Sequence, residues 1–381
     1  MKLVNARIFD SEKEEFRVGS VTVNAETGNI EKVSFGDVSA DGVDMGGNML
    51  VPGFIDAHTH GRNGYDFNKA SKEEMKKMAA GYLKNGVTTV MPTLASAMPD
   101  DLAVSSRIIN EMKSEKSGAR FAGIHLEGRY LNVSKRGAHA ADLLTAPDAS
   151  ELAGLFESMG TPCHISAALE LDEDGSFTRL ALEKGATLGL GHTSATCKQA
   201  LDIYERARVS FTHTYNAMTP LHHREAGVVG AALLCDGYAE LICDGMHICP
   251  EVVALTYKIK GSDRLVLISD SMEATGHGDG EYSIAGMKVI VKDGKALTTD
   301  GALAGSTLEL ADGVRNLVRF AGISLEKAIP CATRNPAKML KLEDCGEIAE
   351  GKRADMLVIT EDTENVFEIK NIVLGGEFVK V

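Results

Sequence analysis

The sequence predicts an α/β protein, a (β/α)8 TIM-like barrel with a small β-sandwich domain built from both termini. Short apolar runs recur along the middle of the chain with helix-like segments between them, which is typical of βαβ units around a parallel sheet. Both ends of the chain are β-rich instead and lack helical periodicity. Ionisable side chains follow most of the apolar runs, which places a candidate site on one face of that barrel.

The two ends of the chain predict the small domain. Their expected strands share apolar alternation and glycine-containing turns, and they cover residues 2–9, 19–23, 30–33, 347–348, 354–359 and 369–381. Because chain termini often lie close together, we expect these strands to form one domain of residues 1–48 and 345–381. The barrel then takes residues 49–344.

Eight apolar runs in the middle predict the barrel strands. They are residues 53–56, 88–92, 121–126, 165–169, 187–190, 210–212, 240–243 and 265–269. Between them, stretches such as 71–85 and 101–114 carry Lys, Glu and apolar residues at helical spacing. Eight strands over roughly 290 residues match the usual size of a barrel, and an open doubly wound sheet is the structural alternative.

Composition indicates which partners the protein can bind and where in the cell we expect it. The 381 residues include 40 Lys+Arg and 54 Asp+Glu, and a net charge of −14 argues against nucleic acid as a partner. No apolar run approaches the ~18 residues of a membrane span, and the first residues become polar too early for a signal peptide. The seven scattered cysteines contain no CxxC pair, which argues against a disulfide framework. We therefore expect a cytoplasmic protein without a membrane partner.

The residues that end the predicted strands indicate a divalent metal site. They are His58, His60, Glu127, His192, His213, His247 and Asp270. The carboxyl ends of barrel strands converge on one face, and imidazole with carboxylate suits zinc and similar ions. Alternation along a strand also puts His58 and His60 on the same side.

Each of these residues has a structural alternative when it is taken alone. Glu127 suits an ion pair at the barrel rim, and His192 and His213 suit satisfied buried imidazoles. Together the three supply the protein ligands of a catalytic metal site with one open position. Asp270 is the expected general base, with a helix N-cap as its alternative. A carboxylate beside an activated water predicts hydrolysis.

Two cationic loops indicate an anionic substrate, because arginine binds phosphate and carboxylate in two-pronged fashion. They are residues 135–139 and 222–224. We expect His139 and Arg224 to contact substrate, and Lys135 and Arg136 to belong to a solvated loop.

Short motifs that contain these polar residues lie along nearly the whole chain. They are residues 51–61 (VPGFIDAHTHG), 125–128 (HLEG), 191–192 (GH), 213 with 216–218 (NAM), 221–225 (LHHRE), 244–247 (DGMH), 269–270 (SD) with 274–276 (ATG), 303–307 (LAGST) and 346–355 (GEIAEGKRAD). Together they resemble the motifs of the N-acetylglucosamine-6-phosphate deacetylases of the amidohydrolase superfamily. The resemblance implies a hydrolase of amino-sugar catabolism that removes acetate from N-acetylglucosamine 6-phosphate and gives glucosamine 6-phosphate.

The same resemblance implies roles for individual residues. Glu127, His192 and His213 would hold the main metal ion, His58 and His60 a second ion bridged by Glu127, and Asp270 and His247 would be catalytic. Substrate contacts would fall on Ala138, His139, Asn216, Ala217, Arg224, His247, Leu303, Ala304, Gly305 and Ser306. Zinc is the expected metal, with iron, manganese and cobalt as alternatives, one or two ions per subunit, in a homodimer with its phosphate pocket near the subunit interface.

Departures from the family pattern leave alternatives open. Arg129-Tyr130 stands where the family usually has Pro-Phe, and Thr214-Tyr215 replaces an apolar-aromatic pair, so a preference for the galactosamine epimer is the first alternative. A dihydroorotase-like or deaminase-like enzyme is disfavoured because residues 165–170 contain no lysine to bridge metals. A catalytically inert barrel scaffold should have lost a ligand or the base, and this sequence keeps them.

Overall fold

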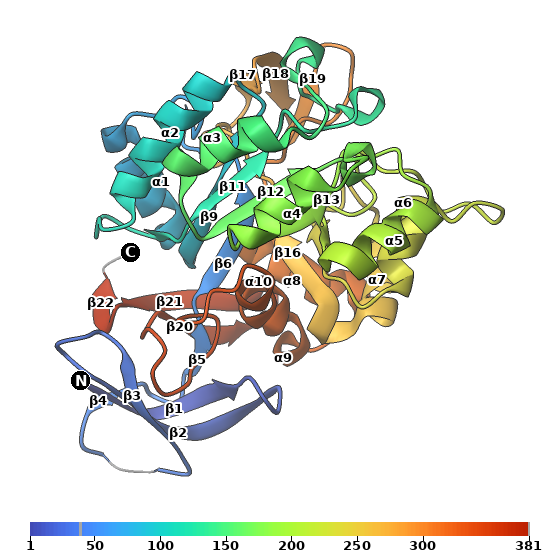
Figure 1. The fold of residues 1–381 in the computed structure, drawn as a ribbon. Coiled ribbons are helices and arrows are strands. Elements are labelled where there is room, and N and C mark those ends of the chain that lie inside the picture. The colour runs from blue at the N-terminus through green and yellow to red at the C-terminus, as the bar shows by residue number, and fades with distance from the viewer. Residues whose placement is uncertain (38–39, 380–381) are drawn as a thin grey trace.

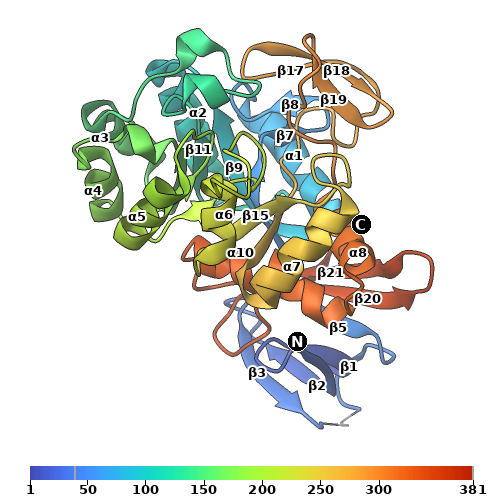
Figure 2. The same ribbon diagram turned by 90° about the vertical axis from the view of Figure 1, so that its right-hand side faces the viewer.

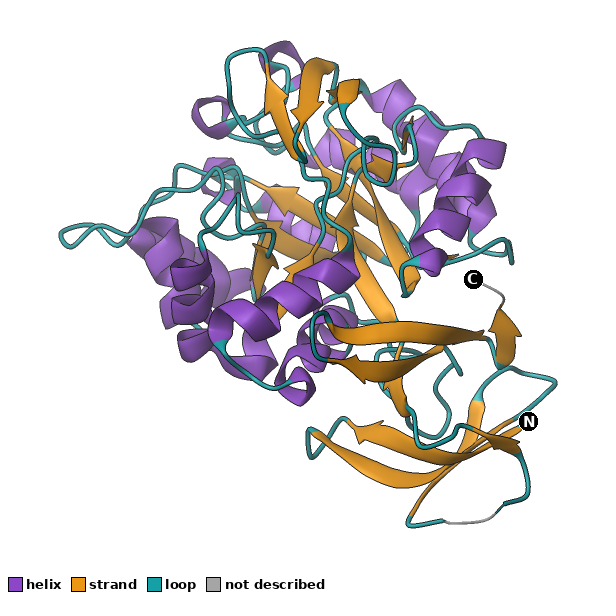
Figure 3. Ribbon diagram, turned by 180° about the vertical axis from the view of Figure 1, so that it is seen from behind, coloured by secondary structure: helices purple, strands orange, loops and turns teal. Residues whose placement is uncertain are grey.

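The computed structural model describes residues 1–37 and 40–379. In Figure 1 a barrel with helices around it occupies the middle, a sheet made from both chain ends lies at one end, and a small sheet of three strands lies at the other. The outer ring of helices around the barrel strands is seen from behind in Figure 3. The carboxyl ends of the barrel strands therefore lie away from the terminal sheet.

Eight parallel strands form the barrel and confirm the predicted fold class. They are β6 (Phe54–Thr59), β9 (Val87–Ala95), β11 (Ile124–Glu127), β12 (Cys163–Ala167), β13 (Thr187–Leu190), β14 (Ser210–Phe211), β15 (Ala239–Ile242) and β16 (Leu265–Ile268). Each strand pairs with the next in chain order, and the short β10 (Arg120–Phe121) also pairs with β9. A parallel bridge between Thr59 and Ser271 and a 2.9 Å hydrogen bond from Asp270 N to His58 O connect the last strand to the first.

Helices connect these strands and cover their outer face. They are α1 (Lys72–Lys84), α2 (Pro99–Met112), α3 (Ala149–Met159), α4 (Ser176–Glu183), α5 (Cys197–Ala207), α6 (Gly227–Leu234), α7 (Pro250–Arg264), α8 (Leu310–Ala321), α9 (Leu325–Ala328) and α10 (Arg334–Met339). Shorter 3-10 turns occur at η1 (Val133–Lys135), η2 (Ala141–Leu143), η3 (Leu169–Leu171) and η4 (Ile329–Ala332). The predicted segment 71–85 is α1 with its two caps, because Ser71 and Glu74 form a capping box.

Both chain ends build the terminal sheet. Its strands are β1 (Lys2–Asp10), β2 (Glu15–Val23), β3 (Ile30–Phe35), β4 (Val43–Asp44), β5 (Met49–Pro52), β20 (Met356–Asp362), β21 (Val366–Leu374) and β22 (Glu377–Val379). Hydrogen bonds join them into a single sheet, whose two halves share a buried apolar core that includes Ile8, Val21, Met356 and Val373.

Strand β5 lies past the boundary that we expected at residue 48. It pairs with β1 on one side and with β20 on the other, so residues 49–52 belong to the terminal sheet. The predicted strand at 347–348 does not form, since those two residues lie in the turns that precede β20.

Two small antiparallel ribbons follow β6 and β16 at the other end of the barrel. They are β7 (Gly61–Arg62) with β8 (Tyr65–Asp66), and β17 (Gly280–Ile284) with β18 (Met287–Lys292) and β19 (Lys295–Thr298). Figure 2 shows them close together above the barrel. The second ribbon buries Ile284 and Val289 against Met272, Ala304 and Ala138, which fixes it over the carboxyl ends of the strands.

None of the described helices is long and apolar enough to cross a membrane.

Candidate active site

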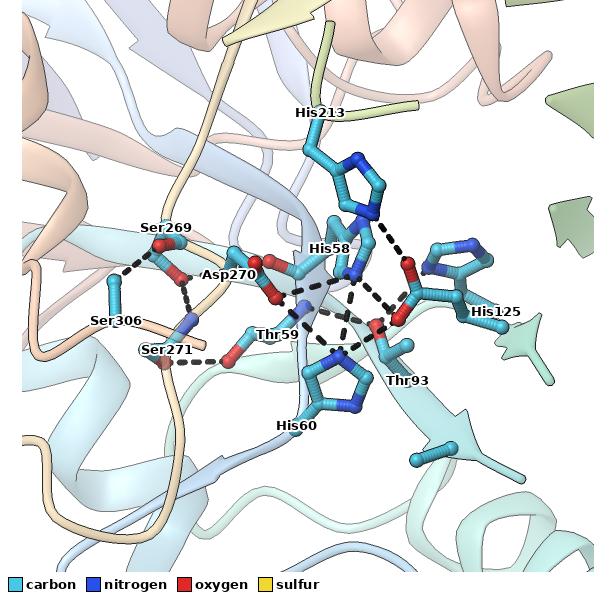
Figure 4. Close-up of polar contacts among 12 residues, drawn as sticks. His58, Thr59, His60, Thr93, His125, His213, Ser269, Asp270, Ser271 and Ser306 are labelled. Atoms are coloured by element: carbon cyan, nitrogen blue, oxygen red, sulfur yellow. Dashed lines mark hydrogen bonds and ion pairs between the residues drawn. The ribbon is translucent and has the colours of Figure 1, made fainter. Parts of the chain in front are cut away.

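The residues that end the barrel strands converge as predicted. His58 and His60 come from β6 and Glu127 from β11, while His192, His213 and Asp270 directly follow β13, β14 and β16. In Figure 4, His58, His60 and Asp270 point toward one another, and His213 approaches from the opposite side. All of these side chains are buried.

A left-handed backbone aims three of these side chains. His192, His213 and Asp270 have φ values of 46°, 30° and 49°, which residues other than glycine rarely adopt. Each turns the chain sharply immediately after its strand ends. Such strained positions cluster at functional sites, where surrounding contacts enforce them. For Asp270, the enforcing contacts are hydrogen bonds from its N to His58 O and from Ser306 N to its own O at 2.7 Å.

Glu127 lies between two pairs of histidines. Its Oε1 is 2.8 Å from His213 Nε2 and 3.3 Å from His192 Nε2. Its Oε2 is 3.0 Å from His60 Nε2 and 3.2 Å from His58 Nε2. Burial opposes the charged carboxylate, but the charge of His58 and hydrogen bonds from the surrounding imidazoles outweigh it and hold the pKa of Glu127 well below its usual range.

The arrangement suits a divalent cation. The Nε2 atoms of each histidine pair face one another, at 3.0 Å for His192 and His213 and at 3.3 Å for His58 and His60. Across the described chain, no lysine or arginine pairs with Glu127 or Asp270. Several imidazole nitrogens around acceptor-only carboxylates are the donor set that zinc-type ions take.

The electrostatics of His60 lead to the same conclusion. Burial disfavours its charged form, but Asp270, 3.3 Å away, and Glu127 outweigh burial and raise the pKa of His60 to about 9. The position between these two carboxylates therefore attracts positive charge. The donor atoms of His58, His60 and Glu127 form one compact candidate metal group, and those of Glu127, His139 and His192 form another.

Two further histidines have fixed ring orientations. His139 Nδ1 is 2.8 Å from Ser96 Oγ, and burial together with the nearby His192 lowers the pKa of His139 to about 3, so its ring is neutral. His247 Nδ1 lies 2.6 Å from Asp244 Oδ2, while Asp244 Oδ1 accepts the backbone N–H of His247. His139, expected only as a substrate contact, thus also lies at the metal cluster.

His125 is not among the predicted metal ligands, and both its ring nitrogens contact hydroxyls. They lie 2.8 Å from Ser166 Oγ and 3.1 Å from Thr93 Oγ1.

A cavity of about 230 Å³ opens above these residues at the mouth of the barrel. Its walls carry most of the expected substrate contacts, and they comprise His60, Glu127, Gly137, Ala138, His139, His192, His213, Asn216, Ala217, His247, Asp270, Ile284, Ala285, Leu303, Ala304 and Gly305. Ile284 and Ala285 were not anticipated. The alternating run around the Ala285-Gly286 turn is a hairpin signal, but nothing in it shows that the hairpin folds back over the barrel.

Two expected contacts lie elsewhere. Ser306 is buried behind the cavity wall, where its Oγ donates to Ser269 O at 2.5 Å and supports the strand end that carries Asp270. Arg224 lies on an exposed hairpin closed by backbone hydrogen bonds between His222 and Glu225, and its Nη1 is 2.7 Å from His223 Nε2. That hairpin holds Arg224 in solvent, outside the cavity of its own chain.

Arg129 and Tyr130, the departures from the family pattern, lie outside the cavity and bind the same carboxylate. Arg129 donates from Nε and Nη2 to the two carboxylate oxygens of Glu151, at 2.7 and 2.9 Å, and Tyr130 Oη donates to the same carboxylate at 3.0 Å. Arg129 has a φ of 59°, whereas proline is restricted to about −65°. The loop after Glu127 therefore follows a path that proline at position 129 does not permit.

Arg129→Pro is expected to destabilise the fold by roughly 2–4 kcal/mol, because it forces a different backbone angle and removes the Glu151 ion pair. Urea unfolding measures the loss. Arg129→Gly is the matched control, since glycine accepts the positive φ and loses only the side-chain contacts. Equal unfolding midpoints for the two variants would show that the backbone angle at 129 is unimportant.

Comparison with known proteins identifies the family. The amidohydrolase family model matches residues 49–379. The chain is 33% identical to an N-acetylglucosamine-6-phosphate deacetylase of Lysinibacillus sphaericus, covering 85% of each protein. It is also 33% identical to an N-acetylgalactosamine-6-phosphate deacetylase of Escherichia coli O157:H7, covering 82% of this chain and 83% of the relative.

Solved structures agree over the whole chain. The crystal structure of N-acetylglucosamine-6-phosphate deacetylase from Thermotoga maritima has a TM-score of 0.88 at 31% identity, covering 99% of both chains. A mutant of the Mycobacterium smegmatis enzyme in complex with N-acetyl-D-glucosamine-6-phosphate has a TM-score of 0.90 at 29% identity, covering 99% of this chain and 98% of that one. The chain belongs to the amidohydrolase family and, within it, to the N-acetylglucosamine-6-phosphate deacetylases.

Proposed function

We propose that this protein hydrolyses the acetamide of N-acetylglucosamine 6-phosphate and releases acetate and glucosamine 6-phosphate. The observation that carries the proposal is the position of Asp270. Its carboxylate lines the cavity and lies 3.3–3.4 Å from His60 and His58, beside the Glu127 cluster. A proton acceptor next to a metal-type donor set, at the floor of a cavity, suits amide hydrolysis. The family relationship supports the same reaction.

In this proposal, Glu127, His192 and His213 would hold a first divalent ion, and His58, His60 and Glu127 would hold a second. Zinc is the native metal that we propose, since imidazole and carboxylate donors suit it best. The chemistry that such an ion would supply is polarisation of the acetyl carbonyl and a lower pKa of the attacking water.

Asp270 and His247 complete the chemistry in the proposal. Asp270 takes the proton from the attacking water and returns it to the nitrogen of the sugar as the C–N bond breaks. His247 steadies the bound acetamide from the cavity wall, while Asp244 fixes the orientation of its ring. Both groups sit at strand ends of a rigid barrel, which favours a preorganised site.

Substrate is proposed to bind along the remaining walls. Ala138, His139, Asn216, Ala217 and the loop of residues 303–305 face the sugar, and Ile284 and Ala285 cover it from the hairpin. Arg224 is proposed to contact the phosphate of the substrate. Its hairpin is exposed and lies outside the cavity of its own chain, so this contact is proposed to form within a homodimer, which we place in the cytoplasm. Ser306 acts in this proposal by supporting the strand end of Asp270.

Acetate release tests the proposal directly. We expect acetate from N-acetylglucosamine 6-phosphate, none from the unphosphorylated sugar, loss of activity with a chelator and recovery with added zinc. The galactosamine 6-phosphate epimer is the second candidate substrate, because a relative of that name is as similar as the glucosamine enzyme. The epimer from which acetate is released faster is the preferred substrate. Metal-loaded protein that releases no acetate from either phosphorylated sugar would contradict the proposal.

A further inference from the structure

Glu240 lies inside the barrel beneath the candidate metal cluster. It comes from β15, is 1% exposed, and accepts a hydrogen bond from Ser210 Oγ at 2.9 Å through Oε1. Its Oε2 has no hydrogen-bond partner within the described structure and lies 3.7 Å from His58 Nδ1, a buried atom that likewise lacks one. His164 Nε2, also unpartnered, lies 3.7 Å from Oε1. Two buried imidazole nitrogens without other partners thus face one carboxylate, whose Oε2 also lacks a partner.

The His58 ring lies between carboxylates on both of its edges. Its Nε2 faces Glu127 at 3.2 Å and Asp270 at 3.4 Å, and its Nδ1 faces Glu240. An ionised carboxylate only accepts hydrogen bonds, so Glu240 favours the tautomer with the proton on Nδ1. That tautomer leaves a free lone pair on Nε2, the atom directed at the cluster.

A second histidine of the cluster has an equivalent partner. His192 Nδ1 is 2.7 Å from the backbone carbonyl of Lys135, which fixes the ring of the first ion site in the same sense. The Nδ1 atoms of His60 and His213 have no hydrogen-bond partner among the described residues. Each histidine pair therefore contains one ring whose Nδ1 faces an acceptor. For His192 the acceptor is a backbone carbonyl, and for His58 it is Glu240.

A structural role alone does not require a carboxylate at this position. Neutral glutamine has nearly the same shape and accepts equally well from Ser210. Burying a carboxylate without a lysine or arginine partner is costly, and the ion-pair contacts of Glu240 within residues 1–37 and 40–379 are both to histidines. The charge of Glu240 is best explained by the His58 ring that it faces.

We infer that Glu240 is a positioning residue that fixes the tautomer and orientation of His58 and thereby sets the affinity of the second metal site, formed by His58, His60 and Glu127. This inference rests on the two-ion assignment of the proposed function. Glu240 acts only through His58, since it does not line the cavity.

Zinc titration of Glu240→Gln tests the inference. We expect wild-type protein to bind two ions, and the variant to bind the first normally and the second about 10–100-fold more weakly. The matched control is His164→Asn, which removes the other imidazole facing Glu240 and leaves the Glu240–His58 pair intact. It should bind both ions as wild type does. Calorimetry gives the two affinities, and atomic emission gives the metal content after dialysis.

Two results would overturn the inference: Glu240→Gln binding both ions as tightly as wild type, or wild-type protein binding a single ion. Neither result would contradict the proposed acetate release. Wild-type protein that binds two ions but releases no acetate would contradict the proposed function and would not contradict this inference. If Glu240→Gln does not fold, Ser210→Ala removes the hydroxyl that holds Oε1 and should weaken the second ion selectively. Unchanged affinity in a folded Ser210→Ala would count against the inference.

Discussion

Asp270→Asn is expected to lower kcat for acetate release by about 10²–10⁴-fold while the ion held by Glu127, His192 and His213 stays bound. The asparagine amide keeps the shape of the side chain but cannot accept a proton. The left-handed turn that aims Asp270 is maintained by backbone hydrogen bonds to His58 and Ser306, which the substitution leaves in place. A fall in kcat with little change in KM would identify proton transfer as the lost step.

Asp56→Asn is the matched control for that experiment. Asp56 is equally buried on β6, but its carboxylate accepts from Ser269, at 2.6 Å from the hydroxyl, and lies outside the cavity wall. Burial raises the pKa of Asp56 to about 6, so a neutral amide is a mild replacement there. We expect near-normal kcat. Near-normal kcat in metal-loaded Asp270→Asn would instead assign the proton transfer to another group.

Glu127→Gln is expected to abolish the stabilisation of the fold by zinc. Each oxygen of Glu127 faces one histidine pair, so the variant loses a carboxylate oxygen at one ion site and the negative charge at both. At free zinc about 1,000-fold above its Kd, one site stabilises the wild-type fold by roughly 4 kcal/mol. Scanning calorimetry with zinc and with chelator should show a clear rise in Tm for wild type and little or none for the variant, and acetate release should be lost.

Glu170→Gln controls for the loss of a carboxylate at the same rim. Glu170 accepts hydrogen bonds from Thr193 Oγ1 at 2.6 Å and from Ser194 N at 2.8 Å, just beyond His192. Among the described residues, no hydrogen bond or ion pair joins Glu170 to a proposed ligand side chain. The zinc-dependent rise in Tm should persist in this variant. A rise of wild-type size in Glu127→Gln would show that the ion binds elsewhere.

The strand-end residues were predictable because one simple rule governs them. In a parallel barrel, every strand presents its last residues to the same face, so the apolar runs and the polar residue at the end of each were enough to bring Glu127, His192 and Asp270 together. The capped helix α1 was predictable for a similarly local reason, since Ser71 and Glu74 are spaced as a capping box.

The features that the sequence did not predict depend on contacts between distant segments. Ile284 and Ala285 reach the cavity only because their hairpin packs on Met272 and Ala304. Arg224 lies outside the cavity of its own chain because a turn of its hairpin directs it outward. Glu240 belongs to no recognisable motif and lies within β15. Its contact with His58 forms only because the barrel brings β15 and β6 together.

The central place of β5 in the terminal sheet has a consequence during synthesis. Its neighbour β1 emerges from the ribosome early, but its other neighbour, β20, emerges only after all barrel strands have been made. Until then one edge of β5 is unpaired, and β5 continues through Gly53 directly into the strand that carries His58 and His60. Nascent chains fold from the N-terminal end, so anchoring of the first barrel strand at its base waits until β20, which follows all barrel strands in the chain, has been made. Loss of β20 would therefore affect His58 and His60, at the opposite end of β6.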